Sequence, residues 1–554
     1  MLAEIPGEGR HLRRADRYIV APTRPLSPPP RDVPDADAPP TFQLYNTRTR
    51  RVEPLAPQEP DHLRFYACGP TVYAFAHIGN FRSFLTADLI LRTARALGWD
   101  VTYVSNVTDV GHLSEDDLTD PAGEDKMAQA LDEEGRRFAN VYDLARFYTE
   151  ALVEDWHRLN LREPAVRPRA TEHMAEQIQA VEQLEERGHT YETERGVYFS
   201  VDSFPAYGKL SGNEEAQQLQ AAGRDTVSDP EKRDPRDFAL WKKDPDHLMQ
   251  WHSPWGWGFP GWHIECSVMG RAYLGETFDL HTGGEDLIFP HHECEVAQNE
   301  SLRSGTGDGS DGGSGGPAIS HWAHTRFLQV EGEKMSKSEG NFFTVRDLAL
   351  PESEGGEGID PLALRLTLMS GQYRKPFNFT RKTLRDSART VRRYRAVRDR
   401  VDGALDEDAS RDDPIGAELD AIYDRTLAAM CDDLNTPAAL AAAYEGVKLI
   451  GRLDDDALNG ATARSAMDWL ERTNALLGIV WNDTDAPDAS SEEEADTDDA
   501  FARQVEALLD ERAAARENGD YDRADALRDR LENEMDVEVM DGPDGTDWRR
   551  KVKV

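Results

Sequence analysis

The chain has few cysteines and no long apolar run, and each absence excludes a class of protein. Only four cysteines occur in 554 residues, too few for a disulfide framework, so we expect a reduced cytoplasmic protein without disulfides. No apolar run approaches the roughly 18 residues that a membrane span needs, and no secretory apolar segment follows the start. We therefore expect no membrane partner.

Lysine is also scarce, at 12 positions, whereas acidic residues number 104 and the formal net charge is −40. Such a composition is typical of halophilic proteins, from cells whose internal salt is about molar and whose Debye length is roughly 3 Å. An acidic balance ordinarily argues against a nucleic-acid partner. Strong screening removes most of that objection, although it weakens phosphate contacts too. An acidic enzyme with a small-molecule substrate stays open as the simpler alternative.

The first informative segment combines a buried strand with a helix. We predict strands over Leu63–Cys68 and Val101–Val107, with an amphipathic helix over Gly79–Leu97 between them. This order predicts the first half of a doubly wound parallel sheet. His77 and Asn80 then lie at a helix N-terminus, where free N–H groups and the positive end of the helix dipole attract phosphate.

The second informative segment is a polar loop about 250 residues later. Lys334 and Lys337 flank a Met-Ser pair between Gly332 and Gly340. A mobile loop with two lysines suits the stabilisation of negative charge while an α-phosphate is attacked. Together the two segments indicate an ATP site for adenylation chemistry.

These segments resemble the HIGH and KMSKS signatures of class I aminoacyl-tRNA synthetases. Neighbouring motifs narrow the resemblance to the cysteinyl-tRNA synthetase family, from about Thr41 to the C-terminus. The motifs are Cys68-Gly-Pro-Thr-Val-Tyr73, Asn106-Val-Thr-Asp109, Gly261-Trp-His-Ile-Glu-Cys266 and His281-Thr-Gly-Gly-Glu-Asp286, followed by His291-His-Glu-Cys-Glu295. The resemblance implies activation of L-cysteine with Mg²⁺-ATP, transfer of cysteine to the 3′-terminal ribose of tRNA-Cys, and a monomer.

The resemblance also implies one Zn²⁺ per subunit, held by Cys68, Cys266, His291 and Glu295. Two thiolates, an imidazole and a carboxylate form a plausible tetrahedral zinc set. His291 and Glu295 are four residues apart and share a helix face if Pro290 starts a helix. Without the family motifs, buried cysteines and a solvent-facing histidine pair would be the simpler interpretation.

One position departs from the family pattern. Cys294 stands where the family usually has asparagine, three residues from His291, and so competes with Glu295 as a ligand. We keep Glu295 as the expected ligand. The resemblance implies that the zinc also accepts the substrate thiolate, for which the hydroxyl of serine is a much poorer substitute. Discrimination of roughly 10⁴–10⁵ then needs no editing domain, and none is evident in the sequence.

Further roles follow from the resemblance. Residues expected around the bound amino acid are Thr108, Trp262, His263 and His281. The adenosine is expected at Gly283, Gly284 and Asp286, with the carboxylate on the ribose hydroxyls. The triphosphate and the catalytic charge stabilisation are assigned to His77, Asn80, Lys334 and Lys337. Aromatic packing for the tryptophan and internal hydrogen bonds for the histidines remain the structural alternatives.

The fold class we expect is α/β, with a class I Rossmann-like catalytic domain, then a helical bundle and a small C-terminal α/β anticodon-recognition module. The boundaries are a disordered extension 1–40, a catalytic domain 41–345 with a helix-like insertion about 115–235 and a Gly/Ser loop 304–316, a helical connection 346–400, a bundle 401–482, an acidic linker 483–499 and a C-terminal module 500–554. Within that module, Trp548 could stack on an unpaired base.

Periodic apolar positions predict helices over 381–403, 416–430 and 435–453, and a local reversal of charge marks this region. Residues 381–400 hold nine basic side chains against Asp386 and Asp399, a net charge of +7 in a chain of −40. A solvated face is the simpler interpretation, and phosphate contact is the alternative.

Two rival functions stay open. A cysteine ligase of the mycothiol-pathway type would pass cysteine to an amino sugar, but it needs neither the basic helix nor the C-terminal module. A catalytically idle tRNA-binding paralogue would have no chemical need for both phosphate-binding segments.

Overall fold

The structure is a computed structural model in which two units are described separately, Met1–Thr484 and Asp485–Val554. The described segments are 40–111, 126–212, 231–303, 316–336, 340–405, 413–454, 457–483, 521–533, 537–542 and 545–550, with single residues between 508 and 515. The expectations for the extension 1–40, the Gly/Ser loop, the acidic linker and Lys337 therefore lie largely or wholly outside the described residues.

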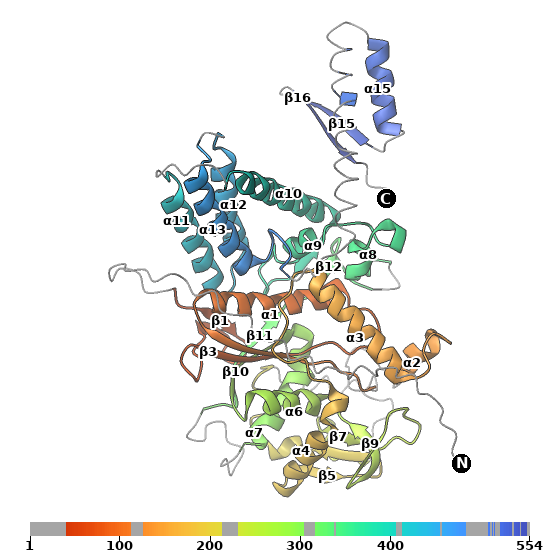
Figure 1. Cartoon of the computed structure of the whole chain (residues 1–554). Helices are drawn as coiled ribbons and strands as arrows, with labels where there is room; N and C mark the ends of the chain where they lie inside the picture. Colours follow the sequence, from red (N-terminus) through yellow and green to blue (C-terminus); the bar gives the residue numbers. More distant parts are fainter. Residues whose placement is uncertain are drawn as a thin grey trace, which may run out of the picture. The chain divides into compact units, whose positions relative to one another are not determined.

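A parallel sheet of four strands forms the centre of the first unit, in the order β11-β10-β3-β4. Its strands are β3 (His62–Ala67), β4 (Asp100–Ser105), β10 (Phe278–Gly284) and β11 (Ile319–Thr325). Helix α1 (Ile78–Ala96) covers one face and α6 (Trp262–Leu274) the other, with α7 (Glu293–Ser301) beside α6 (Figure 1). The predicted doubly wound sheet is confirmed, and only the element ends differ by one or two residues.

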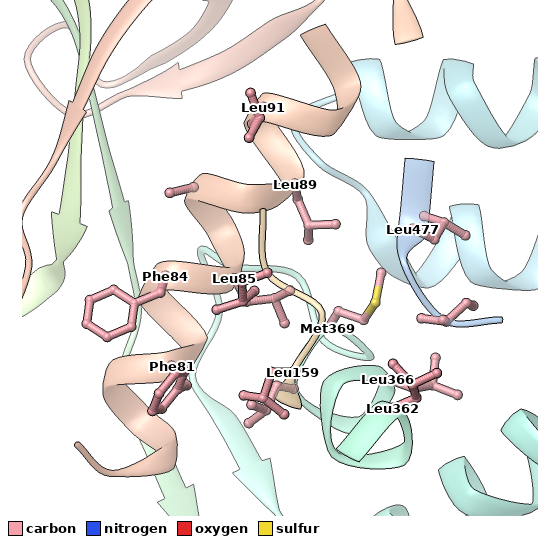
Figure 2. Packing of buried hydrophobic residues seen from close by; sticks show 14 of the residues in the cluster. Phe81, Phe84, Leu85, Leu89, Leu91, Leu159, Leu362, Leu366, Met369 and Leu477 are labelled. Atoms are coloured by element: carbon pink, nitrogen blue, oxygen red, sulfur yellow. The ribbon is translucent and has the colours of Figure 1, made fainter. Parts of the chain in front are cut away.

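Helix α1 is buried along almost its whole length. Its apolar side chains pack against α9 (Pro361–Leu368) and against Leu159 and Leu477, as Figure 2 shows. Asp88 and Arg92 of α1 are buried as well. A helix surrounded on all sides is held by packing rather than by a single amphipathic face.

A buried charge network ties α1 to distant segments. Asp88 accepts hydrogen bonds from the Arg92 side chain at 2.8 Å and from the Arg365 side chain at 2.6 Å. Burial alone would raise the pKa of Asp88, but the two guanidinium groups lower it below its ordinary value. Arg92 also donates to the carbonyls of Asn474 and Ala475, near the end of α13 (Gly460–Leu477).

The inserted segment differs from the prediction. It contains the expected helices α2 (Lys126–Glu133), α3 (Val141–Arg158) and α4 (Met174–Glu186), but also an antiparallel sheet in the order β5-β6-β7-β9-β8. The strands are β5 (Thr190–Glu192), β6 (Gly196–Phe199), β7 (Phe238–Lys242), β8 (Trp251–Ser253) and β9 (Gly256–Pro260). The sheet was not predicted because strands of three to five residues are too short to show an alternating pattern. The sheet also continues past residue 235, where the insertion was expected to end.

The lysine loop belongs to a small sheet that is separate from the main sheet. This sheet has the order β13-β12-β14, with β12 (Leu328–Val330), β13 (Glu333–Lys334) and β14 (Phe377–Phe379). The short helix α8 (Val345–Ala349) follows the loop. Strands β1 (Gln43–Asn46) and β2 (Arg51–Pro54) pair as a hairpin that was not predicted.

The helical region contains the predicted periodic stretches. They form α10 (Arg381–Gly403), α11 (Gly416–Cys431) and α12 (Thr436–Gly451), and α13 packs against α10 and α11. Helix α10 crosses the boundary expected at residues 400 and 401. None of the helices in the described segments has the length and apolar character that crossing a bilayer requires.

The second unit contains a helix and a two-stranded antiparallel sheet. They are α15 (Tyr521–Asn533), β15 (Val537–Gly542) and β16 (Gly545–Arg550). Trp548 lies on β16, and its side chain is outside the described part of the structure.

We expect replacement of Asp88 by alanine to lower the free energy of unfolding of the first unit by about 3–5 kcal/mol, because it removes the carboxylate that two buried guanidinium groups share. The other acidic neighbour of Arg92, Asp483, lies 3.9 Å away. Urea unfolding followed by tryptophan fluorescence measures the change. Asp424→Ala, at an exposed position of α11, is the matched control. Equal unfolding midpoints for the two variants would contradict the importance of the network.

Candidate metal centre and nucleotide site

Parallel pairing of β3 and β10 places Cys68 beside the carboxyl end of β10. The Cys68 N–H donates to the Thr282 carbonyl at 3.1 Å. Gly69 follows, and its N–H donates to the Asn106 side chain at 2.7 Å. A Cβ added at Gly69 would lie 1.7 Å from the Asn106 carbonyl oxygen, so only glycine allows this approach. The position of Cys68 is thereby fixed by backbone contacts on both sides.

Four ligand-bearing side chains meet at this edge. Cys68, Cys266, His291 and Glu295 are buried, and their ligand atoms lie within 4.8 Å of one another. The two sulfurs are 3.7 Å apart, and the Glu295 Oε1 lies 3.8 Å from the Cys68 Sγ. His291 Nε2 is 3.2 Å from the same Oε1. The cluster combines α6, the helical turn η5 (Ile288–His292) and α7 with the end of β3.

The distances fit a tetrahedral zinc ion. With Zn–S near 2.3 Å and Zn–N or Zn–O near 2.0 Å, tetrahedral edges are about 3.8 Å between sulfurs and about 3.3 Å between nitrogen and oxygen. Burial raises the pKa of the Cys68 thiol well above its ordinary value, and Cys266 and Glu295 raise it further. A bound cation would compensate this buried concentration of acidic groups.

A second grouping shares two of these residues. Cys68 and Glu295 also lie close to His281 and His292. His281 Nε2 is 3.1 Å from Glu295 Oε2, so its hydrogen bond orients the carboxylate. His292 Nδ1 is 2.7 Å from His324 Nε2, which directs its other nitrogen toward the Cys68 Sγ at 3.3 Å. The set with two thiols has the donor chemistry that zinc prefers.

Sequence reasoning missed three contributors to this layer, His292, His324 and Trp322. His281 stacks on Trp322 with ring centroids 4.6 Å apart. His292 directly follows His291 in the same motif, so its position near the candidate ligands could have been inferred from the sequence. His324 and Trp322 lie on β11, and only the parallel pairing of β10 with β11 brings them to the cluster.

Cys294 points away from the candidate ligands. It is fully buried, and its Sγ lies 3.5 Å from the Tyr207 hydroxyl oxygen. Neither group of potential metal ligands contains it. The neighbouring Glu293 accepts hydrogen bonds from the backbone N–H groups of Gly208 and Ser211 at 2.9 and 2.7 Å. These contacts fix the first turn of α7 with Glu295 toward the cluster.

His77 caps helix α1, one residue before its first turn. The Asn80 N–H donates to His77 Nδ1 at 3.1 Å, and the His77 N–H donates to Asn80 Oδ1 at 3.0 Å. Burial lowers the pKa of His77 to about 4, so the ring is neutral near pH 7. Since Nδ1 accepts a hydrogen bond, the proton is on Nε2. His77 therefore presents a donor at a helix N-terminus.

The lysine loop packs against that N-terminus. The Ile78 N–H donates to the Phe343 carbonyl at 3.0 Å, and the ring centroids of His77 and Phe342 are 5.4 Å apart. A Cβ added at Gly79 would lie 3.4 Å from the Met335 Cε. The structure thus brings together the two segments that are about 250 residues apart in the sequence. Lys334 is exposed beside them.

The amino-acid residues expected from the sequence also gather here. Trp262 lies with its ring centroid 4.3 Å from that of His291, and His263 Nδ1 is 2.9 Å from His291 Nδ1. Thr108 is buried and accepts a hydrogen bond from the Asn106 side chain at 3.2 Å. With His281, which bonds Glu295, these contacts place all four expected residues around the cluster or the turn that holds Cys68.

Close neighbours explain why glycine occupies two positions at the end of β10. A Cβ at Gly283 would lie 2.8 Å from His292 Cε1, and one at Gly284 would lie 2.3 Å from Asp286 Oδ1. The Gly284 position is also 3.7 Å from Ser83 Oγ of α1. Asp286 itself is exposed. The exposed carboxylate therefore lies at the sheet edge that faces α1.

Family models match three parts of the chain. Residues 54–389 match the model described as tRNA synthetases class I (C) catalytic domain. Residues 426–481 match the DALR domain, and residues 498–549 match the cysteinyl-tRNA ligase anticodon binding domain. The catalytic-domain match includes the parallel sheet, the cluster and the lysine loop.

Curated relatives match over nearly the whole chain. The cysteine–tRNA ligase of Salinibacter ruber is 63% identical over 527 residues, which cover 93% of this chain and 99% of the relative. The cysteine–tRNA ligase of Rhodospirillum rubrum is 40% identical and covers 92% of this chain and 100% of the relative.

Among solved structures, methionyl-tRNA synthetase of Mycobacterium tuberculosis in complex with methionyl-adenylate superposes with a TM-score of 0.51. The identity is 15%, and the match covers 75% of this chain and 92% of that one, so it shows the shared fold alone. Family models, curated relatives and fold agree. The chain belongs to the cysteine–tRNA ligase family of class I aminoacyl-tRNA synthetases.

Proposed function

We propose that the chain activates L-cysteine with Mg²⁺-ATP and transfers it to tRNA-Cys, with Zn²⁺ held by Cys68, Cys266, His291 and Glu295 selecting the substrate thiol. The observation that carries this proposal is the buried cluster of four ligand atoms in a chain 63% identical to a cysteine–tRNA ligase. We further propose one Zn²⁺ per chain in a monomeric cytoplasmic enzyme. The high identity supports the overall reaction, and the cluster supports the metal.

Substrate selection follows from the chemistry of the donor set. When bound, zinc supplies a Lewis acid that favours a substrate thiolate over the hydroxyl of serine. His281 holds the Glu295 carboxylate, and Trp262 closes the side of the cluster next to His291. We assign Thr108 and His263 to the binding of the rest of the amino acid. The protein residues thus orient the ligands and limit the size of the side chain that enters.

In the first step, the carboxylate of cysteine attacks the α-phosphorus of ATP, and pyrophosphate leaves with its electron pair. The neutral His77 ring donates from Nε2, because its Nδ1 is occupied by the Asn80 N–H. The Asn80 Nδ2 adds a further donor, and the positive end of the α1 dipole attracts phosphate oxygens. The N–H groups of Ile78 and Asn80 are already bonded, to the Phe343 carbonyl and to His77. Positioning and charge stabilisation, rather than acid–base chemistry, account for catalysis at such a centre.

The lysine loop supplies the positive charge. Lys334 leads the loop, whose backbone is held by Asn341 through its hydrogen bonds with the Ser336 N–H at 2.7 Å and the Lys334 carbonyl at 3.2 Å. We assign Lys337 the same role. Gly283, Gly284 and Asp286 accept the adenosine, with Asp286 bonding the ribose hydroxyls. The packing of the lysine loop against Gly79 supports the roles assigned to the two lysines.

In the second step, a hydroxyl of the terminal ribose of the tRNA attacks the acyl carbon, and AMP leaves. Class I architecture implies the 2′-hydroxyl. The proton of that hydroxyl has an acceptor in the phosphate of the leaving AMP, and we assign no side chain as general base. The second unit and the helical region then serve to hold the tRNA.

We expect zinc-loaded protein to charge a tRNA bearing the anticodon GCA with labelled cysteine, and not with serine, in roughly molar KCl chosen for its screening of the acidic surface. Acid-precipitable label measures the product. Cysteine-dependent pyrophosphate exchange without charging would instead indicate a ligase with a small acceptor, such as an amino sugar. Absence of both activities would contradict the proposed function.

Replacement of Cys266 by serine is expected to remove most of the zinc, whereas Cys294→Ser should retain about one zinc per chain. The reason is that Cys266 is within the cluster and Cys294 faces Tyr207. Inductively coupled plasma mass spectrometry gives the metal content, and circular dichroism checks folding. Zinc loss from the Cys294 variant would overturn the assignment of Glu295.

Replacement of Lys334 by methionine should lower kcat for cysteine-dependent pyrophosphate exchange by about 10²–10³, because a charge that acts in the transition state is removed. Lys375→Met, another exposed lysine in the same region, is the control and should retain activity. Zinc content should be the same in both variants. Equal kcat values would exclude a catalytic role for Lys334.

A further inference from the structure

The segment of residues 341–347 connects the lysine loop with the start of α1. Its first residue, Asn341, holds the loop through the side-chain hydrogen bonds described above. Three residues later, Thr344 pairs with His77 in an antiparallel bridge, next to the backbone hydrogen bond that α1 donates to this segment. The position of the segment therefore determines how the lysine loop lies relative to His77.

Helix α8 begins within this segment, and its own residues account for its folding. The Asp347 N–H donates to Thr344 Oγ1 at 3.1 Å, and the Thr344 N–H donates to Asp347 Oδ2 at 2.7 Å, which caps the helix in both directions. Val345 and Leu348 are fully buried in the core of the first unit. None of these contacts uses the side chain of Arg346.

The Arg346 side chain instead reaches away from α8 to helix α3. It donates to the Ala151 carbonyl at 3.3 Å, pairs with Glu154, and places its Nε 3.3 Å from Asp155 Oδ2. Its guanidinium carbon also lies 5.1 Å from the centroid of the Phe75 ring. Phe75 is two residues before the cap of α1, so one guanidinium contacts both α3 and the chain that leads to the cap.

Helix α3 supports Phe75 as well. The Phe75 ring packs edge-on against the rings of Tyr148 and Phe147, with centroid distances of 5.1 and 6.0 Å. Tyr148 is buried. Three elements thus meet at the guanidinium of Arg346: α8 after the lysine loop, α3, and the chain before α1.

Neutralising the buried carboxylate of α3 does not by itself require Arg346. Asp155 has a side chain that is 2% exposed; its burial raises its pKa to about 6, against the opposing effect of Arg346 and Arg158. Arg158, on the same helix, already lies 2.7 Å from Asp155 Oδ1. The second arginine comes from another element, and what it adds is a connection between α8 and α3.

We propose that Arg346 is a positioning residue for the adenylation step, an inference that rests on the proposed function. Its guanidinium fixes the segment after the lysine loop against α3 and Phe75, so that Lys334 and His77 keep the relative position that the transition state requires. Arginine suits this role because its planar fork bonds a carbonyl and two carboxylates while one face lies on a ring. A lysine would supply only a point charge.

A purely structural role, in which Arg346 does no more than hold α3 in place, makes a different prediction. Removal of the side chain would then lower stability and leave the kinetics of the folded protein unchanged. A positioning role lowers kcat, because the charge that acts in the transition state is displaced, and the loss should depend on the presence of that charge.

The test compares Arg346→Met with Arg158→Met in the full, zinc-loaded chain. Arg158 is the matched control, since it pairs with the same two carboxylates, Glu154 and Asp155, but lies on α3 itself. Both variants should lower the urea midpoint of unfolding to a similar extent. Arg346→Lys is a milder variant for the same measurements, because it keeps the charge beside Asp155 and loses the planar fork.

We expect Arg346→Met to lower kcat for cysteine-dependent pyrophosphate exchange by roughly 10–10²-fold, because a small displacement of a catalytic charge is costly. The KM values for ATP and cysteine should stay within about twofold of the wild-type values, since ground-state contacts are kept. Arg346→Lys should show a smaller loss of kcat of the same kind. Arg158→Met should match the wild type in kcat.

A double variant tests whether Arg346 acts through the lysine loop. In a chain that already carries Lys334→Met, the further change Arg346→Met should lower kcat by about twofold at most, because the charge that Arg346 positions is absent. Zinc content and circular dichroism should be the same in the single and double variants.

Equal kcat values for the Arg346→Met and Arg158→Met variants would overturn the proposal, because any loss would then come from the carboxylates that the two arginines share. Multiplication of the separate losses in the double variant would overturn it too, since it would show that Arg346 and Lys334 act independently. In both cases the wild type remains active and the proposed function stands. A wild-type chain without cysteine-dependent exchange would overturn the proposed function and this inference together.

Discussion

The parallel pairing of β3 with β10 is the constraint on which the site depends. Because the carboxyl ends of parallel strands meet at one edge of a sheet, Cys68 and the glycines after His281 are neighbours although they are more than 200 residues apart. Helices α6 and α7 then enter from one face, and α1 begins on the other. A shift of one residue in this pairing would turn every side chain to the opposite face and disperse the cluster.

The net charge of the whole chain and the pairing of neighbouring charged side chains are two separate features of this molecule. Over the whole chain the balance is −40, which strong salt screens. At close range the acidic and basic groups are paired or grouped for particular contacts, as in Asp88 with its two arginines and in the cluster around Glu295. Short-range hydrogen bonds keep their geometry when long-range fields are screened. The local arrangement therefore matters more here than the sum.

Much of the fold and of the site could be predicted from the sequence, because motifs and periodicity are local. The strand before Gly69, helix α1 and helices α10 to α12 were predicted within a few residues. The sheet of the inserted segment was missed because its strands are too short for a pattern. His324 and Trp322 were missed because a place in the site that arises from strand pairing has no local signal. The direction of Cys294 also needed the structure, since spacing alone allowed it to compete with Glu295.

Helix α1 links the proposed ATP site to the helical region. Its first residues face the phosphates of the proposed ATP site, while Arg92, more than three turns later, bonds the carbonyls of Asn474 and Ala475. Arg365 of α9 bonds both Asp88 and the Leu477 carbonyl. Any displacement of α13 relative to α1 must break these buried hydrogen bonds or carry α1 with it. Because breaking charged hydrogen bonds in a buried site is costly, the cheaper motion is one in which both helices move together.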